Sequence, residues 1–236
     1  MNDPIGQAIA DYFELGEAPD IKIQTNYTEG ELLAPAYFFR TESEMPEIEK
    51  TALKLCRGKV LDVGAAAGCH ALVLQEKGLD ITALEMSELA VEVMKKRGVK
   101  KVVCSDIIDF ADKGYDTILL LMNGAGIGGT LGGLTLLLQS LKNLLGKHGR
   151  ILIDSSDISY LFEEEDGSVW IDLANKKYWG EMEYQLTYKN QKSCFNWLFV
   201  DFDTLTEIGK KVGLTVRKIM DGNHYNYLAQ LTLFEE

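Results

Sequence analysis

Residues 60–78, VLDVGAAAGCHALVLQEKG, are the stretch of sequence that decides the fold. An apolar run leads through Asp62 into a turn made only of glycine and alanine, from Gly64 to Gly68, and a helical pattern follows. Small residues let the backbone come close to a ligand, and the N-terminus of a helix offers unpaired N–H donors. The stretch therefore predicts a strand, a ligand-binding turn and a helix.

The same alternation of strand and helix repeats along the chain from residue 58 onward. Glycine suits the left-handed position just past a helix, and nearby cations complement the helix dipole. Basic residues followed by glycine therefore predict helix ends at Gly78, Gly98, Gly149 and Gly213. Short apolar runs, typical of buried parallel strands, occur at 59–63, 79–85, 101–105, 116–121, 150–154 and 215–220.

The final apolar run, 226–234, follows its predecessor after only a few residues. A connection that short cannot make a parallel crossover, so this run should be an antiparallel strand. Strands that alternate with helices predict an α/β fold with a doubly wound sheet. The core is expected to span 58–236.

Two segments depart from this pattern. Residues 1–57 are expected to form an N-terminal segment of two helical stretches joined by an irregular stretch. Residues 160–202 form an insertion with all three tryptophans and 11 of the 22 aromatic residues. Within it, 181–190 and 193–200 predict an antiparallel hairpin. The insertion is either an apolar cluster packed on the core, a cap over the substrate, or a dimer face, and the oligomeric state stays open.

Charge and composition exclude several classes of protein. The net charge of −12 repels phosphate backbones, so nucleic acid is not expected as a partner. The chain shows neither a signal peptide nor an apolar run of about 18 residues, so we expect a cytoplasmic protein with no membrane partner. The four cysteines are widely spaced, which predicts neither a metal site nor disulfides.

Three features in and around the glycine turn restrict the class of ligand that it can bind. Its spacing is G-x-x-x-G, whereas a pyrophosphate cradle has G-x-G-x-x-G. Asp62 suits the cationic aminopropyl end of S-adenosylmethionine better than a pyrophosphate. Glu85 ends the next strand, where a carboxylate can accept hydrogen bonds from two ribose hydroxyls, each contributing about 1.5–3 kcal/mol.

On these residues the chain resembles the class I S-adenosylmethionine-dependent methyltransferases of the bacterial small-molecule type. The resemblance implies a Rossmann-like, seven-stranded mixed sheet of order 3-2-1-4-5-7-6. Ala66 occupies the middle glycine position of the family's loop, which alanine tolerates if its φ is negative. The resemblance also implies that acids bind the ribose and the adenine amino group, and Glu85 and Asp106 match these positions. The full predicted cofactor set is Asp62, Gly64, Ala65, Ala66, Gly68, His70, Glu85, Met86, Asp106, Ile107, Asn123, Arg40 and Tyr37.

Several of these residues have a structural alternative. Asp62 could cap a turn, Asp106 could cap a short helix, and Glu85 could belong to a helix start that Ser87 caps better. Arg40 could form a forked pair with the methionine carboxylate, with Tyr37 in the same pocket, or could be a surface residue beside aromatic rings. The resemblance implies that the segment 1–57 covers the cofactor.

The predicted reaction is methyl transfer from S-adenosylmethionine to a small-molecule acceptor, with S-adenosylhomocysteine as product. It proceeds by in-line displacement at the sulfonium methyl, and alignment supplies roughly 7–11 kcal/mol. His224 is the candidate base if the nucleophile must lose a proton, because imidazole titrates near pH 6.5. The alternatives are a non-catalytic S-adenosylmethionine-binding or regulatory protein and an NAD-dependent oxidoreductase.

Overall fold

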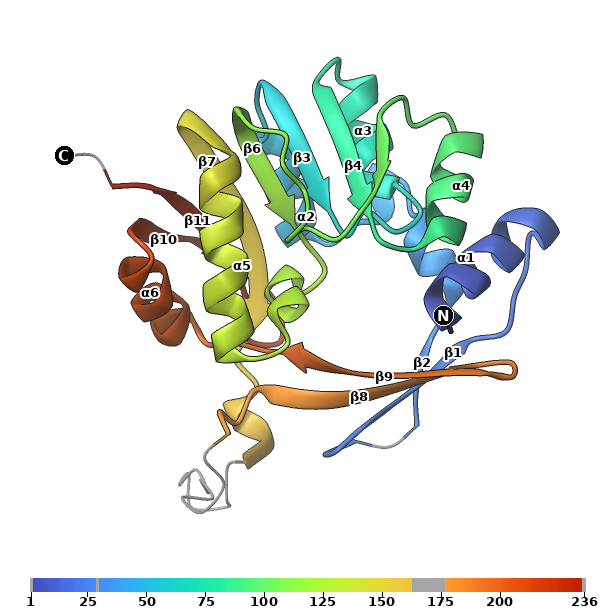
Figure 1. Ribbon diagram of the computed structural model, residues 1–236. Coiled ribbons are helices and arrows are strands. Elements are labelled where there is room, and N and C mark those ends of the chain that lie inside the picture. The colour runs from blue at the N-terminus through green and yellow to red at the C-terminus, as the bar shows by residue number, and fades with distance from the viewer. Residues whose placement is uncertain (1, 29, 163–176, 235–236) are drawn as a thin grey trace.

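The structure is a computed structural model that describes residues 2–28, 30–162 and 177–234. The described residues form two β-sheets, and Figure 1 shows the smaller one crossing the carboxyl edge of the larger one. The larger sheet contains β3 (Lys59–Val63), β4 (Asp80–Glu85), β5 (Val102–Cys104), β6 (Tyr115–Leu120), β7 (Leu145–Ser156), β10 (Leu214–Asp221) and β11 (Asn226–Leu233).

The larger sheet has the strand order β5-β4-β3-β6-β7-β11-β10. This order is the predicted 3-2-1-4-5-7-6, which is thereby confirmed. The pairs β3–β4, β3–β6, β4–β5 and β6–β7 are parallel, whereas β11 pairs antiparallel with both β7 and β10. The antiparallel strand predicted from the short connection before β11 is therefore confirmed.

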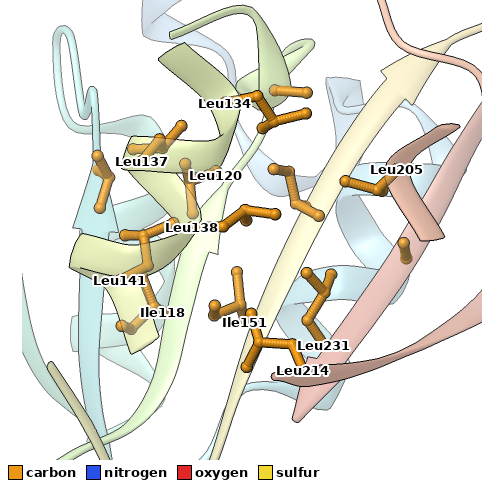
Figure 2. Packing of buried hydrophobic residues seen from close by; sticks show 14 of the residues in the cluster. Ile118, Leu120, Leu134, Leu137, Leu138, Leu141, Ile151, Leu205, Leu214 and Leu231 are labelled. Atoms are coloured by element: carbon orange, nitrogen blue, oxygen red, sulfur yellow. The ribbon is translucent and has the colours of Figure 1, made fainter. Parts of the chain in front are cut away.

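Helices cover both faces of this sheet. They are α2 (Glu47–Leu55), α3 (Cys69–Glu76), α4 (Glu88–Lys96), α5 (Leu131–Leu144) and α6 (Phe202–Lys211). On one face α5 and α6 bury leucines against β6, β7 and β11, as Figure 2 shows for Leu138, Ile151 and Leu231. The opposite face packs on α2, α3 and α4. The inner strands β3, β4, β6 and β7 are thus largely buried on both sides, as their sequences indicated. The prediction of a buried strand at 215–220 is wrong, because β10 lies at the edge of the sheet and exposes Thr215, Arg217 and Lys218.

Local signals set most helix ends, with one exception. Ser87 caps α4 by accepting a hydrogen bond from the Ala90 amide (3.1 Å), and Gly78, Gly98 and Gly213 have the positive φ expected past a helix. The predicted end at Gly149 is wrong, because α5 ends at Leu144. Residues 147–149 instead belong to β7, which pairs with β6 on one side and with β11 on the other.

The smaller sheet joins two distant parts of the chain. It has the order β2-β1-β8-β9, with β1 (Ile21–Thr25), β2 (Glu31–Leu33), β8 (Glu181–Tyr188) and β9 (Gln191–Leu198). The predicted hairpin within 160–202 is present as β8–β9, but β8 also pairs antiparallel with β1. The N-terminal segment is therefore not only helical, since the stretch expected to be irregular contains β1 and β2. Its helices are α1 (Pro4–Leu15), η1 (Pro35–Phe39), η2 (Glu42–Glu44) and α2, and η4 (Ser159–Phe162) precedes β8.

Helix α1 lies against the smaller sheet and α4. Its residues Ala8 and Ile9 are fully buried in a cluster with Ile21, Leu186 and Tyr188. Asp3 caps α1 through the Gly6 amide (2.8 Å), and Ser87 donates a hydrogen bond to the same aspartate (2.5 Å). These contacts fix the smaller sheet against the carboxyl edge of the larger sheet. Among the described helices, none combines the length and apolarity needed to cross a bilayer.

Candidate cofactor and methyl-transfer site

The glycine turn after β3 is held by backbone hydrogen bonds to β4. The amides of Gly64 and Ala65 donate to the Leu84 carbonyl at 2.9 and 3.1 Å. Gly64 and Gly68 have φ values of +72° and +80°. Ala66 also has a positive φ, +48°, so the condition under which alanine was expected to suit this position is not met. That conformation costs an alanine about 1–2 kcal/mol, and the turn imposes it because a neighbouring carboxylate binds the Ala66 amide.

That carboxylate belongs to Glu85 at the carboxyl end of β4. One of its oxygens, Oε2, accepts from the Ala66 amide (2.9 Å), and Oε1 accepts from the amides of Met86 (2.8 Å) and Ser87 (3.0 Å). The residue is partly exposed. Each carboxylate oxygen has two acceptor sites, and three of the four are occupied, so one site on Oε2 remains for a ligand hydroxyl. Glu85 thus both shapes the turn and stays available where a ribose is expected.

The predicted adenine side has exposed apolar surface. Met86 is 65% exposed and follows Glu85, and Ile108 is 56% exposed beyond the end of β5. Ile107 is buried, whereas Asp106 is exposed and accepts a hydrogen bond from the Ile108 amide (2.9 Å). Asp106 therefore makes a local turn contact, as its structural alternative describes.

Asp62, two residues before the turn, is buried within β3. It is 2% exposed, and its Oδ2 atom has no hydrogen-bond partner among the described residues. Burial raises the pKa of Asp62 to about 6, and the positive charge of His70 opposes that effect. An unpartnered buried carboxylate oxygen is costly, so it fits a site completed by a cationic ligand.

The turn after β6 comes closest to the smaller sheet. Met122 and Asn123 both have positive φ, and η3 (Gly124–Gly128) follows. The buried Asp154 at the end of β7 accepts from the Gly124 amide (2.9 Å). Burial raises the pKa of Asp154 to about 6, although the amides of Gly124 and Asn123 lower it. Asp154 thus stabilises the conformation of this turn.

The Asn123 side chain is directed to the smaller sheet. It donates to the Leu198 carbonyl (3.0 Å) and accepts from the Ser155 hydroxyl (2.9 Å). Both polar atoms of the Asn123 side chain thus bind protein groups, and the cofactor contact predicted for this residue stays a prediction. Next to it, Gly126 is in contact with the Trp197 indole so closely that no side chain fits there. The glycines after β6 therefore allow β9 to pack closely against this turn.

The face of β8–β9 that meets this turn is aromatic. Strand pairing places Tyr184 opposite Phe195 and Met182 opposite Trp197, and residues opposite each other share a face. Ring centroids of Tyr184, Phe195 and Trp197 lie 6.0–6.4 Å apart. Tyr184 packs against the same hydrophobic cluster as Ala66 and Met122. We call Tyr184, Phe195, Trp197 and Phe199 the aromatic face.

Arg40 and Tyr37 lie in the segment just before α2. The Arg40 guanidinium stacks 3.6 Å above the Tyr37 ring, and its Nε donates to the Tyr37 carbonyl (2.8 Å). The arginine is not a surface residue, since its side chain is 8% exposed. Its Nη2 binds Glu49, a residue of α2 that was not among the predicted site residues. His70, in the first turn of α3, binds the same glutamate.

The candidate base His224 lies elsewhere. It occupies the turn between β10 and β11 with a φ of +58°, and its side chain is exposed. It lines a cavity of about 610 Å³ with Lys218, Asp221 and Tyr227. In the described part of the chain, no residue of the predicted cofactor set lines that cavity. The structure therefore does not bring His224 together with the cofactor residues, and its role as base stays a prediction.

Comparison with known proteins identifies the class. The strand order, the glycine turn and the carboxylate after β4 together define the cofactor domain of class I S-adenosylmethionine-dependent methyltransferases. A family model described as a methyltransferase domain matches residues 61–124. A crystal structure of a methyltransferase from Bacteroides fragilis, in complex with S-adenosylhomocysteine, is 41% identical with a TM-score of 0.93. The similarity covers 99% of this chain and 96% of that one.

The chain belongs to the S-adenosylmethionine-dependent methyltransferases, and S-adenosylmethionine is its cofactor. The CcbJ methyltransferase from Streptomyces caelestis shares the fold at 12% identity (TM-score 0.64), over 83% of this chain and 99% of that one. A 23S rRNA (uracil(747)-C(5))-methyltransferase from Pyrococcus horikoshii is 30% identical over 96 residues, which is 38% of this chain and 23% of that protein. The chain thus covers about a quarter of that relative, and neither NAD-dependent oxidation nor a non-catalytic role gains support.

Proposed function

We propose that the chain methylates a small-molecule acceptor bound between the glycine turn and the aromatic face. The observation that carries this proposal is the position of the aromatic face. Trp197 contacts Gly126 in the turn after β6, and Tyr184 packs against the same hydrophobic cluster as Ala66 of the glycine turn and Met122. In this proposal these rings form the apolar lining of a small-molecule site. Of the interpretations of the insertion, the proposal adopts a substrate cap for β8–β9.

Charge supports the same class of acceptor. The net charge of −12 disfavours an RNA backbone in the site. Near the aromatic face, the negative charge of Glu31 adds to burial in raising the pKa of Tyr184 to about 12. Aromatic rings beside an acidic residue favour a neutral or cationic group. The similarity to the rRNA enzyme covers 38% of this chain and 23% of that protein, which is too little to carry its acceptor over to this chain.

The protein supplies alignment and exclusion of water. When bound, S-adenosylmethionine supplies an activated methyl on a sulfonium. In this proposal Glu85 binds its ribose, Asp62 its ammonium group and Arg40 its carboxylate. The aromatic face holds the acceptor and excludes water, and Asp154 fixes the turn beneath the reacting groups. Such alignment supplies most of the rate enhancement in a transfer of this kind.

The acceptor class is tested by a methyl-transfer assay. The purified chain and S-adenosylmethionine labelled in the methyl group are incubated in parallel with the low-molecular-weight fraction of a bacterial extract and with its total RNA. We expect label in the small-molecule fraction, and in amines more than in carboxylic acids. Label recovered only in RNA would overturn the proposal.

Glu85→Ala is expected to weaken S-adenosylhomocysteine binding by about one to two powers of ten, because a charge-assisted hydrogen bond to the ribose is lost. Titration calorimetry measures the loss. Since Glu85 also holds Ala66, the matched ligand is 2′,3′-dideoxyadenosine, compared with adenosine. The variant should discriminate less between these two ligands than the wild type does. Unchanged discrimination would leave Glu85 with a role in the turn only.

Phe195→Ala is expected to raise the KM for the acceptor about fivefold to tenfold and to leave S-adenosylhomocysteine affinity unchanged. The ring is 37% exposed on the aromatic face and has apolar contact area to offer an acceptor. Steady-state kinetics with the acceptor from the screen measures the change. Leu32→Ala is the control, because Leu32 is opposite Lys22 on the other face of the same sheet and is 62% exposed. A loss of cofactor affinity in Phe195→Ala would place the ring in the cofactor site instead.

A further inference from the structure

Four ionisable side chains of alternating sign are buried together beside the glycine turn. The Arg40, Glu49 and His70 side chains are 8%, 3% and 6% exposed, and Asp62 is 2% exposed. They come from three separate parts of the chain: the segment before α2, helix α2 itself, and the β3–turn–α3 unit. Glu49 is the member that binds two of the others.

The contacts of Glu49 are short and well directed. Arg40 Nη2 donates to Oε1 (3.1 Å) and Oε2 (3.0 Å), and His70 Nε2 lies 2.7 Å from Oε2. Burial alone raises the pKa of Glu49, but the hydrogen bond from His70 and the charges of His70 and Arg40 hold it below its usual range. Burial alone lowers the pKa of His70, but Glu49 and Asp62 raise it. Glu49 is thus an anion between two cations.

The two ends of this cluster each leave one buried polar atom without a partner. Among the described residues, Arg40 Nη1 and Asp62 Oδ2 make no hydrogen bond. One is a cationic donor and the other an anionic acceptor. The amino-acid end of S-adenosylmethionine is a zwitterion, with a carboxylate for the first and an ammonium for the second. A cluster without its ligand would leave both buried groups uncompensated.

We propose that Glu49 is a positioning residue that holds Arg40 and His70 in one rigid unit and so presents Arg40 to the carboxylate of the methionine moiety. The inference rests on the proposed binding of that carboxylate by Arg40. Stacking on Tyr37 and the bond from Nε to the Tyr37 carbonyl fix the plane of the guanidinium. Glu49 occupies Nη2, which leaves Nη1 as the donor for the ligand.

The alternative is that Glu49 serves stability alone. A buried ion pair is weak evidence of stabilisation, since desolvation offsets most of the attraction. The two roles differ in what they do to ligands. A stabilising role affects every ligand of the site alike, whereas a positioning role affects only ligands that carry the carboxylate.

The test compares two ligands that share the adenosine part. S-Adenosylhomocysteine carries the amino acid, and 5′-methylthioadenosine lacks it. Glu49→Gln should weaken S-adenosylhomocysteine binding about tenfold in calorimetric titration and change 5′-methylthioadenosine binding less than about twofold. Glu47→Gln is the control, because Glu47 lies on the same helix and its side chain is 64% exposed. It should leave both affinities unchanged.

The outcomes separate this inference from the proposed function. Equal weakening of both ligands, or no weakening of S-adenosylhomocysteine, overturns the role of Glu49. Failure of Arg40→Gln to discriminate between the two ligands overturns the carboxylate site itself. If Glu49→Gln does not fold, Glu49→Asp keeps the charge but shortens the reach, and its S-adenosylhomocysteine affinity should again fall selectively.

Discussion

Asp62→Asn is expected to lower the affinity for S-adenosylmethionine by about two powers of ten and at the same time to raise the stability of the unliganded protein. The affinity falls because the buried Oδ2 atom loses the charge that attracts the ligand ammonium, a loss of about 2–3 kcal/mol. The stability rises because an amide is less costly to bury than an ionised carboxylate. Opposite signs for binding and stability are unusual for one substitution.

The pH dependence of stability tests the sign of the stability change in Asp62→Asn independently of ligand binding. Burial raises the pKa of Asp62 from an ordinary 3.8 to about 6 in the folded protein. A group with a raised pKa contributes stability below its unfolded pKa, and this contribution is lost as the pH rises through the folded pKa. Between about pH 4 and pH 6 the wild type should therefore lose roughly 3 kcal/mol relative to Asp62→Asn.

Urea unfolding of the two proteins across this pH range measures the difference. Asp154, whose pKa is also raised to about 6, titrates in both proteins and cancels in the comparison. Asp109→Asn is the control, because Asp109 is exposed and should change neither stability nor affinity. A stability difference that stays constant with pH would show that Asp62 is not the buried, titrating group.

Gly68→Ala is expected to lower the free energy of unfolding by about 2–4 kcal/mol and S-adenosylhomocysteine affinity by about tenfold. The residue begins α3 with a φ of +80°, which costs an alanine about 1–2 kcal/mol. An added Cβ would lie 3.0 Å from both Met94 Cγ and Val99 Cγ2 in the packed core. Relief of that contact moves the turn, and with it the amides next to the ligand.

Gly78→Ala is the matched control for this substitution. Gly78 has nearly the same φ, +81°, but a Cβ there would meet nothing within 4 Å. It should cost only the conformational strain and leave the affinity unchanged. Chemical denaturation with calorimetry measures both quantities. Equal stability losses in the two variants would mean that Met94 and Val99 adapt without cost.

Local signals predicted the larger sheet well. The glycine turn, the strand after it and the short connection before β11 are set by residues close in sequence, so a single chain reveals them. The helix end at Gly149 failed for a physical reason: the basic residues before it extend β7, and pairing of β7 with β6 and β11 outweighs the local C-terminal signal. The positive φ of Ala66 was not predicted, because the Glu85 carboxylate that binds the Ala66 amide lies on the next strand.

Long-range pairings were beyond sequence reasoning. β1 and β2 are short, and only pairing with β8 turns the stretch after α1 into a sheet. The burial of Glu49 in α2 was not predicted, because its partners Arg40 and His70 come from other elements. The aromatic residues were visible, but not the turn that they cover.

The pairing of Lys22 with Thr187 also determines when the site can be completed during synthesis. Contacts between residues far apart in sequence form late, whereas those of β3, β4 and the turn between them are local and form early. A growing chain can therefore form this edge of the larger sheet while β8, the second partner of β1, has not yet been translated. Until β8 emerges, β1 is paired with β2 alone, and its other edge stays open to pairing with another chain.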